Sequence, residues 1–401
     1  MRRSGLVYLT LACAGLAVPL AAQSLRFLSQ AVVVPGVRYQ HLTVPQASWS
    51  VSVNVVAVDL RQSGLSIQAA HAEDKLRGRE TVSAISQRKT TDTTVVIAAV
   101  NADFFNLETG ESENNQVVEG EILKGLKMTD ASADKSLRVH SQFGITGDCR
   151  PLMEQFVFHG TMIRASGARV ELDGINHRTR PSDVVLYTSR TGASVPWDST
   201  GTAMDIRRHY VAHRRDTSVY QVVSFPVAGG TAQFADGPIL SMPVGAENAR
   251  EVPRPGELIR IQTNLQPAPV GLRTVVGGWP RLVVHGRSIT DTVDRVEGTF
   301  PKAFLARNPR TGIGFSRDSA TLYLVTVDGR QEGSDGMTLG EFADLMISLG
   351  IYEGLNLDGG GSTAMVINGK LVNTPAEKNT AGQPVERTVG NALLVVVNRR
   401  D

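Results

Sequence analysis

Cysteine is scarce in this chain of 401 residues, which contains Cys13 and Cys149 and no others. We expect Cys13 to be removed with an N-terminal targeting segment, which leaves Cys149 alone. An internal disulfide is then impossible, and stability outside the cytoplasm has to come from the hydrophobic core. Residues 147–151 have a composition typical of a turn, so Cys149 is not a candidate nucleophile.

The sequence also lacks an excess of charge of one sign and long apolar runs. The formal net charge is +2, and no basic face is interleaved with aromatic residues, so nucleic acid is not an expected partner. After the N-terminal segment, no stretch reaches the roughly 18 apolar residues of a membrane helix. The hydrophobic content of 41% is nevertheless enough to build a core.

The N-terminus has the pattern of an export signal. Arg2 and Arg3 precede an apolar run from Leu6 to about Leu20, and small residues follow this run. We therefore predict a signal peptide over residues 1–23 and an exported protein, periplasmic or secreted.

The remaining chain divides into two predicted regions. Residues 95–398 are expected to form the catalytic domain, and residues 24–94 a strand and helix region that packs on it. Because prolines stand at positions 35 and 45, residues 24 to about 48 are interpreted as connective.

Hydrophobic periodicity predicts many strands and few helices. Helices are predicted at 81–89 and at 338–349, where Thr338 and Glu341 form a capping box. The predicted fold class is α+β, with mixed, largely antiparallel sheets and a few packed helices in a single elaborated catalytic domain. The predicted strands include 51–60 with 65–70 as its hairpin partner, 94–100, 157–163, 184–187, 219–225, 258–261, 313–316, 321–327 and 392–397.

The principal site candidate is the segment 356–363, in which Asp358 is followed by three glycines. Consecutive glycines indicate φ > 0 or close backbone approach, and successive N–H groups can form a nest for anionic oxygen. Asp358 is a candidate base, nucleophile or metal ligand. A strand and an Asn-Gly hairpin turn follow, which excludes a P-loop; the alternative is a tight turn without a ligand. The candidate anion-binding residues are Gly359, Gly360, Gly361, Ser362 and Thr363.

A second candidate follows the apolar strand 94–100, where Asn101 and Asp103 precede two phenylalanines. Polar side chains at the end of a buried strand indicate a site, and the alternative is an Asx-capped turn. The polar, acidic segment 110–116 is predicted to be a mobile loop.

Further candidates lie in the C-terminal third. Arg307 and Arg310 suit bidentate recognition of phosphate or carboxylate, and we expect their guanidinium groups to face the glycine turn. Asp328 and Asp358 both end strands, and if those strands are parallel neighbours, both carboxylates open onto one crevice. The last strand is preceded by Glu386, Arg387 and Asn391, which again indicate the edge of a site.

Taken together, these motifs resemble the phosphodiester glycosidase family. The resemblance spans roughly residues 95–398. One departure is Asn308, where many relatives carry histidine. The matching blocks are 101–105, 277–283, 306–311, 327–330, 336–341, 356–363 and 386–392.

The resemblance implies hydrolysis of a sugar-1-phosphodiester at the glycosidic C–O bond, with a glycosyl phosphodiester or phosphate-containing glycan as the substrate. Asp358, Asp103 and Glu386 are the candidate catalytic carboxylates. The candidate groups that bind or orient the substrate are Arg307, Arg310, Asn101, Asp328, Arg387, Asn391 and the residues of the glycine turn. No cofactor is expected.

Two other hypotheses remain open at the sequence level. One is a noncatalytic module that binds an anionic glycan with the same donors. The other is a metal-dependent phosphodiesterase, in which Asp103, Asp328 and Asp358 would hold a divalent cation through oxygen ligands.

Overall fold

The computed structural model describes residues 25–45, 50–127, 140–192, 194–197, 201–211, 217–224, 230–234, 237–243, 252–267, 271–292, 297 and 306–399. The predicted signal peptide, residues 1–23, lies outside the described residues. Among the helices of the described ranges, none is long and apolar enough to cross a membrane.

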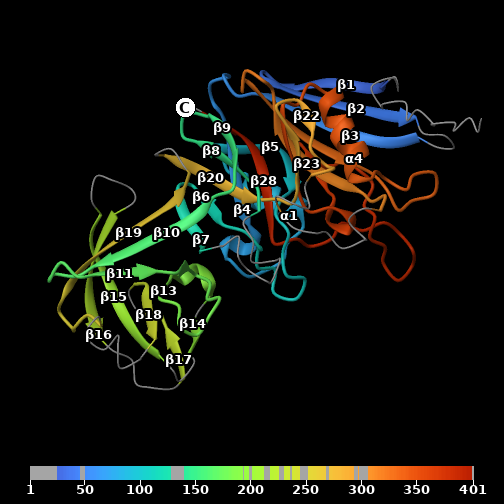
Figure 1. The fold of residues 1–401 in the computed structure, drawn as a ribbon. Helices are drawn as coiled ribbons and strands as arrows, with labels where there is room; N and C mark the ends of the chain where they lie inside the picture. Colours follow the sequence, from blue (N-terminus) through green and yellow to red (C-terminus); the bar gives the residue numbers. More distant parts are fainter. Residues whose placement is uncertain are drawn as a thin grey trace, which may run out of the picture.

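Two sheets form the part of the molecule at the upper right of Figure 1. The eight-stranded sheet has the order β1 (Arg26–Val34), β2 (Val37–Pro45), β3 (Ser50–Asp59), β24 (Thr321–Val327), β23 (Arg310–Phe315), β25 (Glu353–Asn356), β21 (Arg281–Val284) and β22 (Arg287–Ser288). The five-stranded sheet has the order β27 (Lys370–Leu371), β26 (Met365–Ile367), β5 (Thr94–Asn101), β28 (Asn391–Asn398) and β4 (Leu65–His71).

A third sheet continues into a separate lobe, drawn green to yellow at the lower left of Figure 1. Its strands near the other sheets are β6 (Gln116–Val118), β7 (Glu121–Leu126), β8 (Gln142–Thr146), β9 (Pro151–Glu154) and β20 (Leu272–Gly277). The remaining strands are β10 (Val157–Ile163), β11 (Arg169–Leu172), β12 (Gly174–Ile175), β13 (Val185–Tyr187), β15 (Gly201–Val211), β16 (Thr217–Ser224), β18 (Ile239–Pro243) and β19 (Leu258–Gln266). A two-stranded sheet pairs β14 (Ser194–Trp197) with β17 (Gly230–Gln233).

The main core lies between the eight-stranded and five-stranded sheets. Leu324 and Leu355 of the first sheet and Val100 and Leu393 of the second belong to one buried apolar cluster. Helix α4 (Leu339–Ser348) packs with the outer side of the eight-stranded sheet, and helix α1 (Val82–Lys89) with that of the five-stranded sheet. The site is therefore built on two packed sheets with one helix outside each.

The predicted α+β class is wrong, because the protein is mostly β. The α-helices of the described residues are α1 and α4, at the two positions that the sequence predicted. Each helix covers only one outer face of a sheet. Strand side chains fill the core between the eight-stranded and five-stranded sheets and the core of the third sheet.

Two predictions about the N-terminal region also need correction. The interpretation of residues 24 to about 48 as connective is wrong, because β1 and β2 form a hairpin over residues 26–45. Pro35 stands in its turn next to Gly36, whose φ is 82°, and Pro45 ends β2, so both prolines occupy positions that a strand tolerates. The strand after β3 is not its hairpin partner: β4 pairs with β28 in the other sheet.

Strand β23 pairs antiparallel with both β24 and β25. β24 and β25 therefore run parallel to each other but are separated by β23. Their carboxyl ends and the start of β23 lie at one edge of the sheet, which brings Asp328, Asp358 and Arg310 to the same side of the molecule.

Candidate active site

Asn101, at the end of β5, holds the glycine segment against both sheets. Its side-chain N–H donates to the carbonyl of Asp358 at 2.6 Å, and its oxygen accepts from the Thr311 hydroxyl at 2.8 Å and the Ala364 N–H at 3.1 Å. The Asp358 N–H donates to the carbonyl of Ala102 at 2.9 Å. One buried amide thus fixes the position of Asp358.

The three glycines allow close contacts on three sides of the turn. A Cβ at Gly359 would lie 2.7 Å from the carbonyl oxygen of Pro309, and a Cβ at Gly361 would lie 2.3 Å from Nη2 of Arg387. Gly360 has a φ of 62°, and a Cβ there would approach the Arg330 guanidinium within 3.1 Å. Close approach to two arginines and a carbonyl therefore accounts for the glycine run.

The amides of the turn are largely used within the protein. The Gly360 N–H donates to Pro309 at 2.9 Å, and the Ser362 N–H donates to Gly359 at 3.1 Å. The Gly359 N–H donates to Oδ1 of Asp358 at 2.9 Å. The predicted nest of N–H groups is therefore not open at these three positions, although the hydroxyl of buried Thr363 has no hydrogen-bond partner among the described residues.

Arg307 and Arg310 hold the loop 306–310 onto the start of α4. Arg307 binds Glu341 and donates to the carbonyl of Gly336 at 3.2 Å. Arg310 is buried, and its Nε donates to the carbonyl of Met337 at 2.9 Å. The loop itself lies against the glycine turn through Pro309. These contacts of the Arg307 and Arg310 guanidinium groups, however, are with residues at the start of α4 and just before it, and not with the turn.

The guanidinium groups beside the glycine turn belong to Arg330 and Arg387. Arg387 contacts the Ser362 hydroxyl at 3.5 Å and pairs with Glu377. Arg330 donates from Nε and Nη2 to Oδ1 of Asn308 at 3.1 and 2.7 Å. Arg330 was not selected from the sequence, although it ends the block 327–330 that carries the family resemblance.

Burial raises the pKa of Asp358 to about 6. The Ser362 hydroxyl, the Arg387 charge and the Gly359 N–H act in the opposite direction, and the charge of Glu113 raises the pKa further. Burial, together with the charge of Arg330, also lowers the pKa of Arg310 to about 10. The edge of the sheet therefore combines a carboxylate of raised pKa with several cationic groups.

Asp103 is buried and saturated with hydrogen bonds. Its oxygens accept from the Asn114 side chain at 2.8 Å, the Asn114 N–H at 3.0 Å and the Gln116 side chain at 2.6 Å. Its own N–H donates to Asn391 at 2.9 Å. Burial raises the pKa of Asp103 to about 7. These contacts assign Asp103 and Asn391 to positioning the segment 110–116.

The segment 110–116 was predicted to be a mobile loop, and the structure corrects this. Glu113 is exposed, and the other residues of the segment are buried. Asn114 fits because Gly277 has no side chain: a Cβ there would lie 2.3 Å from Asn114. Buried Lys124 pairs with Glu111 at 3.0 Å. The polar composition reflects buried hydrogen bonds rather than exposure to solvent.

Two other predicted site residues hold neighbouring elements. Asp328 is buried and accepts from the Thr374 N–H at 3.2 Å, and burial raises its pKa to about 6. Glu386 accepts from the Ser83 N–H at 2.9 Å, in the first turn of α1. Asp328 therefore contacts the loop that follows β27, and Glu386 contacts the N-terminus of α1.

Phe104 and Trp279 form an aromatic pair that is attached to the strand leading to Asp358. The Trp279 N–H donates to the carbonyl of Asn356 at 2.9 Å, and its ring meets Phe104 edge to face, with centroids 6.4 Å apart. The Trp279 ring also stacks on His140 at 4.7 Å. Phe104 and Trp279 are both half-buried, so part of this aromatic surface faces solvent.

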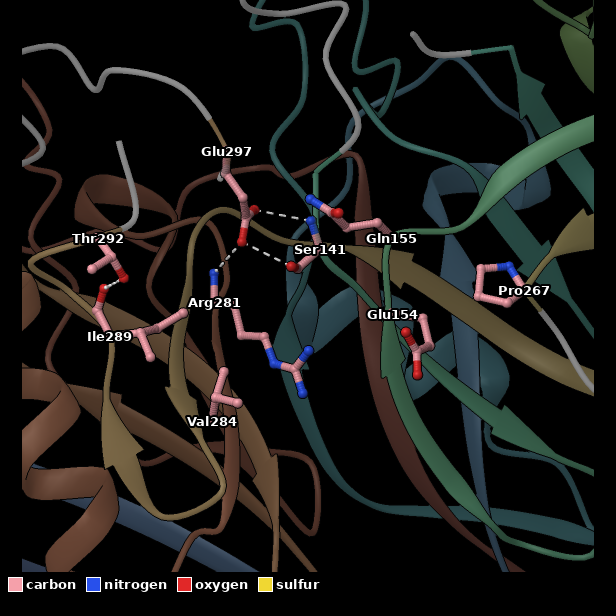
Figure 2. Close-up of a pocket in the computed structure, with 9 residues that line it drawn as sticks. All are labelled: Ser141, Glu154, Gln155, Pro267, Arg281, Val284, Ile289, Thr292 and Glu297. Carbon is pink, nitrogen blue, oxygen red and sulfur yellow. Dashed lines mark hydrogen bonds between the residues drawn. The ribbon is translucent and has the colours of Figure 1, made fainter. Parts of the chain in front are cut away.

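A separate cleft of about 460 Å³ is lined in part by Ser141, Arg281 and Glu297 (Figure 2). The Trp279 indole N–H donates to the carbonyl of Glu297 at 3.1 Å. The Glu297 carboxylate accepts from the N–H and hydroxyl of Ser141 and from the Arg281 N–H, as Figure 2 shows. None of the predicted catalytic carboxylates lines this cleft. Its lining residues are Ser141, Glu154, Gln155, Pro267, Arg281, Val284, Ile289, Thr292 and Glu297.

Comparison with known proteins supports the resemblance found in the motifs. Residues 209–396 match the family model for phosphodiester glycosidase. The chain is 36% identical over 80 residues to the human N-acetylglucosamine-1-phosphodiester alpha-N-acetylglucosaminidase, and 35% identical over 80 residues to that of Bos taurus. It is 35% identical over 89 residues to the SPbeta prophage-derived uncharacterized protein YomE of Bacillus subtilis.

These matches are partial on both sides. They cover 20% of this chain and 15% of each mammalian enzyme, and 22% of this chain and 13% of the Bacillus protein. The chain thus spans about a seventh of the length of these curated relatives.

Two solved structures share the fold. A protein from Synechocystis aligns with a TM-score of 0.71 at 21% identity, over 91% of this chain and 62% of that one. A protein from Burkholderia pseudomallei K96243 aligns with a TM-score of 0.61 at 22% identity, over 86% of this chain and 74% of that one. At these identities the likeness concerns the fold alone.

Proposed function

We propose that the protein hydrolyses the glycosidic C–O bond of a sugar-1-phosphodiester, because residues 209–396 match the family model for phosphodiester glycosidase. The products are a free sugar and a phosphomonoester. The observation that carries the proposal is the placement of Asp358 on a glycine turn flanked by the guanidinium groups of Arg330 and Arg387.

The charges at this turn suit the proposed bond cleavage. The leaving group is a phosphate monoester whose second pKa is about 6, so it departs with little need of a proton. Stabilisation of its negative charge is then the larger requirement. In the proposal, Arg330 and Arg387 supply that stabilisation, and the hydroxyl of Thr363, which has no partner among the described residues, donates to a phosphate oxygen.

Asp358 acts on the sugar in this proposal. Its carboxylate faces the anomeric carbon, where positive charge develops as the C–O bond breaks. The buried surroundings strengthen this interaction because water screens it less. The half-buried rings of Phe104 and Trp279 provide an apolar surface for the sugar ring.

The natural substrate in the proposal is a phosphate-containing glycan of the cell envelope or an exopolysaccharide, which an exported enzyme would meet. The N-terminal pattern of residues 1–23 motivates export. The names of the mammalian relatives specify N-acetylglucosamine, which makes this sugar a suitable first probe.

The bond that is cleaved can be identified with isotopic water. The protein without residues 1–23 is incubated with the methyl diester of α-N-acetylglucosamine 1-phosphate in H₂¹⁸O, alongside the Asp358→Asn variant. We expect the label in the sugar, and no turnover by the variant. Label in the phosphate would show P–O cleavage and contradict the proposal. If a panel of other glycosyl phosphodiesters also showed no turnover, the noncatalytic glycan-binding module would be the remaining hypothesis.

Chelation separates the proposal from the metal-dependent alternative. Asp103, Asp328 and Asp358 each have protein hydrogen-bond donors. We expect turnover to be unchanged after dialysis against EDTA. Loss of activity that returns when Mg²⁺, Ca²⁺ or Zn²⁺ is added back would favour the metal-dependent enzyme.

A further inference from the structure

Glu113 is a carboxylate that the sequence did not single out and that the structure places beside Asp358. Its backbone N–H donates to the carbonyl of Phe104 at 2.9 Å, and the Asp358 N–H donates to the carbonyl of Ala102 at 2.9 Å. Both residues are therefore attached to the short segment 102–104. Asp103, between these two attachment points, binds Asn114 next to Glu113.

Glu113 is close enough to both aspartates to act on them electrostatically. Its negative charge raises the pKa of Asp103 and the pKa of Asp358. Its own pKa is raised by burial around the carboxyl group. The residue is nevertheless exposed, and its carboxylate forms no ion pair with the other described side chains.

Besides Asp358, the catalytic carboxylates predicted from the sequence are Asp103 and Glu386, and both form hydrogen bonds that hold neighbouring segments. Asp103 is buried and accepts three hydrogen bonds, and Glu386 accepts from the first turn of α1. Glu113 is more accessible to solvent than either, since Asp103 is buried and Glu386 is half-buried. At the same time its backbone is held rigidly, since the neighbouring Asn114 is buried and bonded to Asp103 through both its N–H and its side chain.

We propose that Glu113 is the general base that activates water in the reaction proposed above, on which this inference rests. The carboxylate takes one proton from the water molecule. The water oxygen forms a bond to the anomeric carbon, and the bond between that carbon and the phosphate oxygen breaks. The electron pair of the broken bond leaves with the phosphomonoester, and the proton on Glu113 is then released to solvent.

The test compares Glu113→Gln with the matched control Glu108→Gln, a change at an exposed residue of the neighbouring loop. General base catalysis contributes about 10²- to 10⁴-fold. We expect kcat of Glu113→Gln to fall at least about 100-fold, with KM and the melting temperature close to wild type. The control should keep wild-type kcat. The kcat of Glu113→Gln should fall equally for diesters of good and poor phosphate leaving groups, because the base acts on water.

The pH profile of kcat provides a second readout, which tests whether Glu113 lies close enough to Asp358 to act on its carboxyl group. Since the charge of Glu113 raises the pKa of Asp358, the acid limb of the residual activity should move to lower pH in Glu113→Gln. A kcat like that of the control would overturn the role of Glu113, while isotope placement and the Asp358→Asn variant would still test the proposed function. A loss confined to poor leaving groups would instead identify Glu113 as an acid and also overturn the proposal.

Discussion

At the residue scale, the site depends on side chains that are absent as much as on those that are present. Gly361 allows the Arg387 guanidinium to lie against the turn, and Gly277 allows Asn114 to reach Asp103. In both cases a β-carbon would occupy the space of a polar group that contacts a carboxylate or a hydroxyl.

Replacing Gly361 with alanine should displace the Arg387 guanidinium, because the new Cβ would lie 2.3 Å from Nη2. We expect kcat/KM to fall at least about tenfold, which corresponds to about 1.4 kcal/mol of transition-state stabilisation. Steady-state kinetics of the variant measures this loss.

Gly340→Ala is the control for this change. Gly340 lies in α4, where the nearest atom to a new Cβ is the Thr290 hydroxyl at 3.9 Å. Alanine is favoured over glycine in a helix by about 0.5–1 kcal/mol, so the control should keep its activity and gain stability. If Gly361→Ala retained wild-type kcat/KM, the role of Arg387 at the turn would have to be abandoned.

At the element scale, the N-terminus of α4 organises the loop beneath the glycine turn. Thr338 and Glu341 form a capping box, Glu341 also binds Arg307, and Arg310 binds the carbonyl of Met337. The loop 306–310 is therefore held by the N-terminus of α4, which the sequence predicted from its capping residues.

Thr338→Ala should lower the free energy of unfolding by about 1 kcal/mol, because the helix loses the cap from the threonine hydroxyl to the Glu341 N–H. Urea unfolding measures the change. Thr380→Ala, in an exposed loop, should leave the stability close to wild type. Equal stability of the two variants would show that the cap contributes nothing.

At the scale of the whole molecule, burial of acids links stability to pH. Asp103, Asp328 and Asp358 all have raised pKa values, with burial as the main cause. Each is protonated more readily in the folded state than in the unfolded chain. Their stabilising effect is therefore complete below the unfolded pKa, near 4, and is lost as the pH rises through about 6 to 7.

Asp103→Asn removes one of these acids and tests the linkage. The unfolding free energy of the variant, relative to wild type, should shift in favour of the variant by more than about 1 kcal/mol between pH 4 and pH 7. Urea unfolding at the two pH values measures it. The control is Asp318→Asn: hydrogen bonds from Ser316 and Ala320 lower the pKa of Asp318, so it titrates below this range. A constant difference for Asp103→Asn would contradict the linkage.

Local patterns in the sequence predicted several elements correctly. Helix α4 has the predicted capping box, and Gly350 follows it with a φ of 88°. The Asn368-Gly369 turn joins β26 to β27, with positive φ at both residues. Capping, turn geometry and alternation depend on residues close in sequence, so a single sequence is sufficient for them.

Pairing between distant segments was less accessible. β4 was assigned to the strand next to it in sequence but pairs with β28, because hydrophobic alternation specifies a buried face and not a partner. The contacts of Arg307 with Glu341 and of Arg310 with the carbonyl of Met337 were inaccessible for the same reason: charge and spacing are visible in the sequence, but the partner of a guanidinium is not.

The sequence by itself predicted the two helices, the likeness to phosphodiester glycosidases and the candidate site at Asp358 and its glycines, since each depends on short local motifs. Only the tertiary structure decided which cations flank the turn, that Asp103 is enclosed while Glu113 is exposed, and that the molecule is mostly β. These features depend on contacts between segments as far apart as residues 101 and 358, and the geometry of such contacts is set by packing of whole sheets.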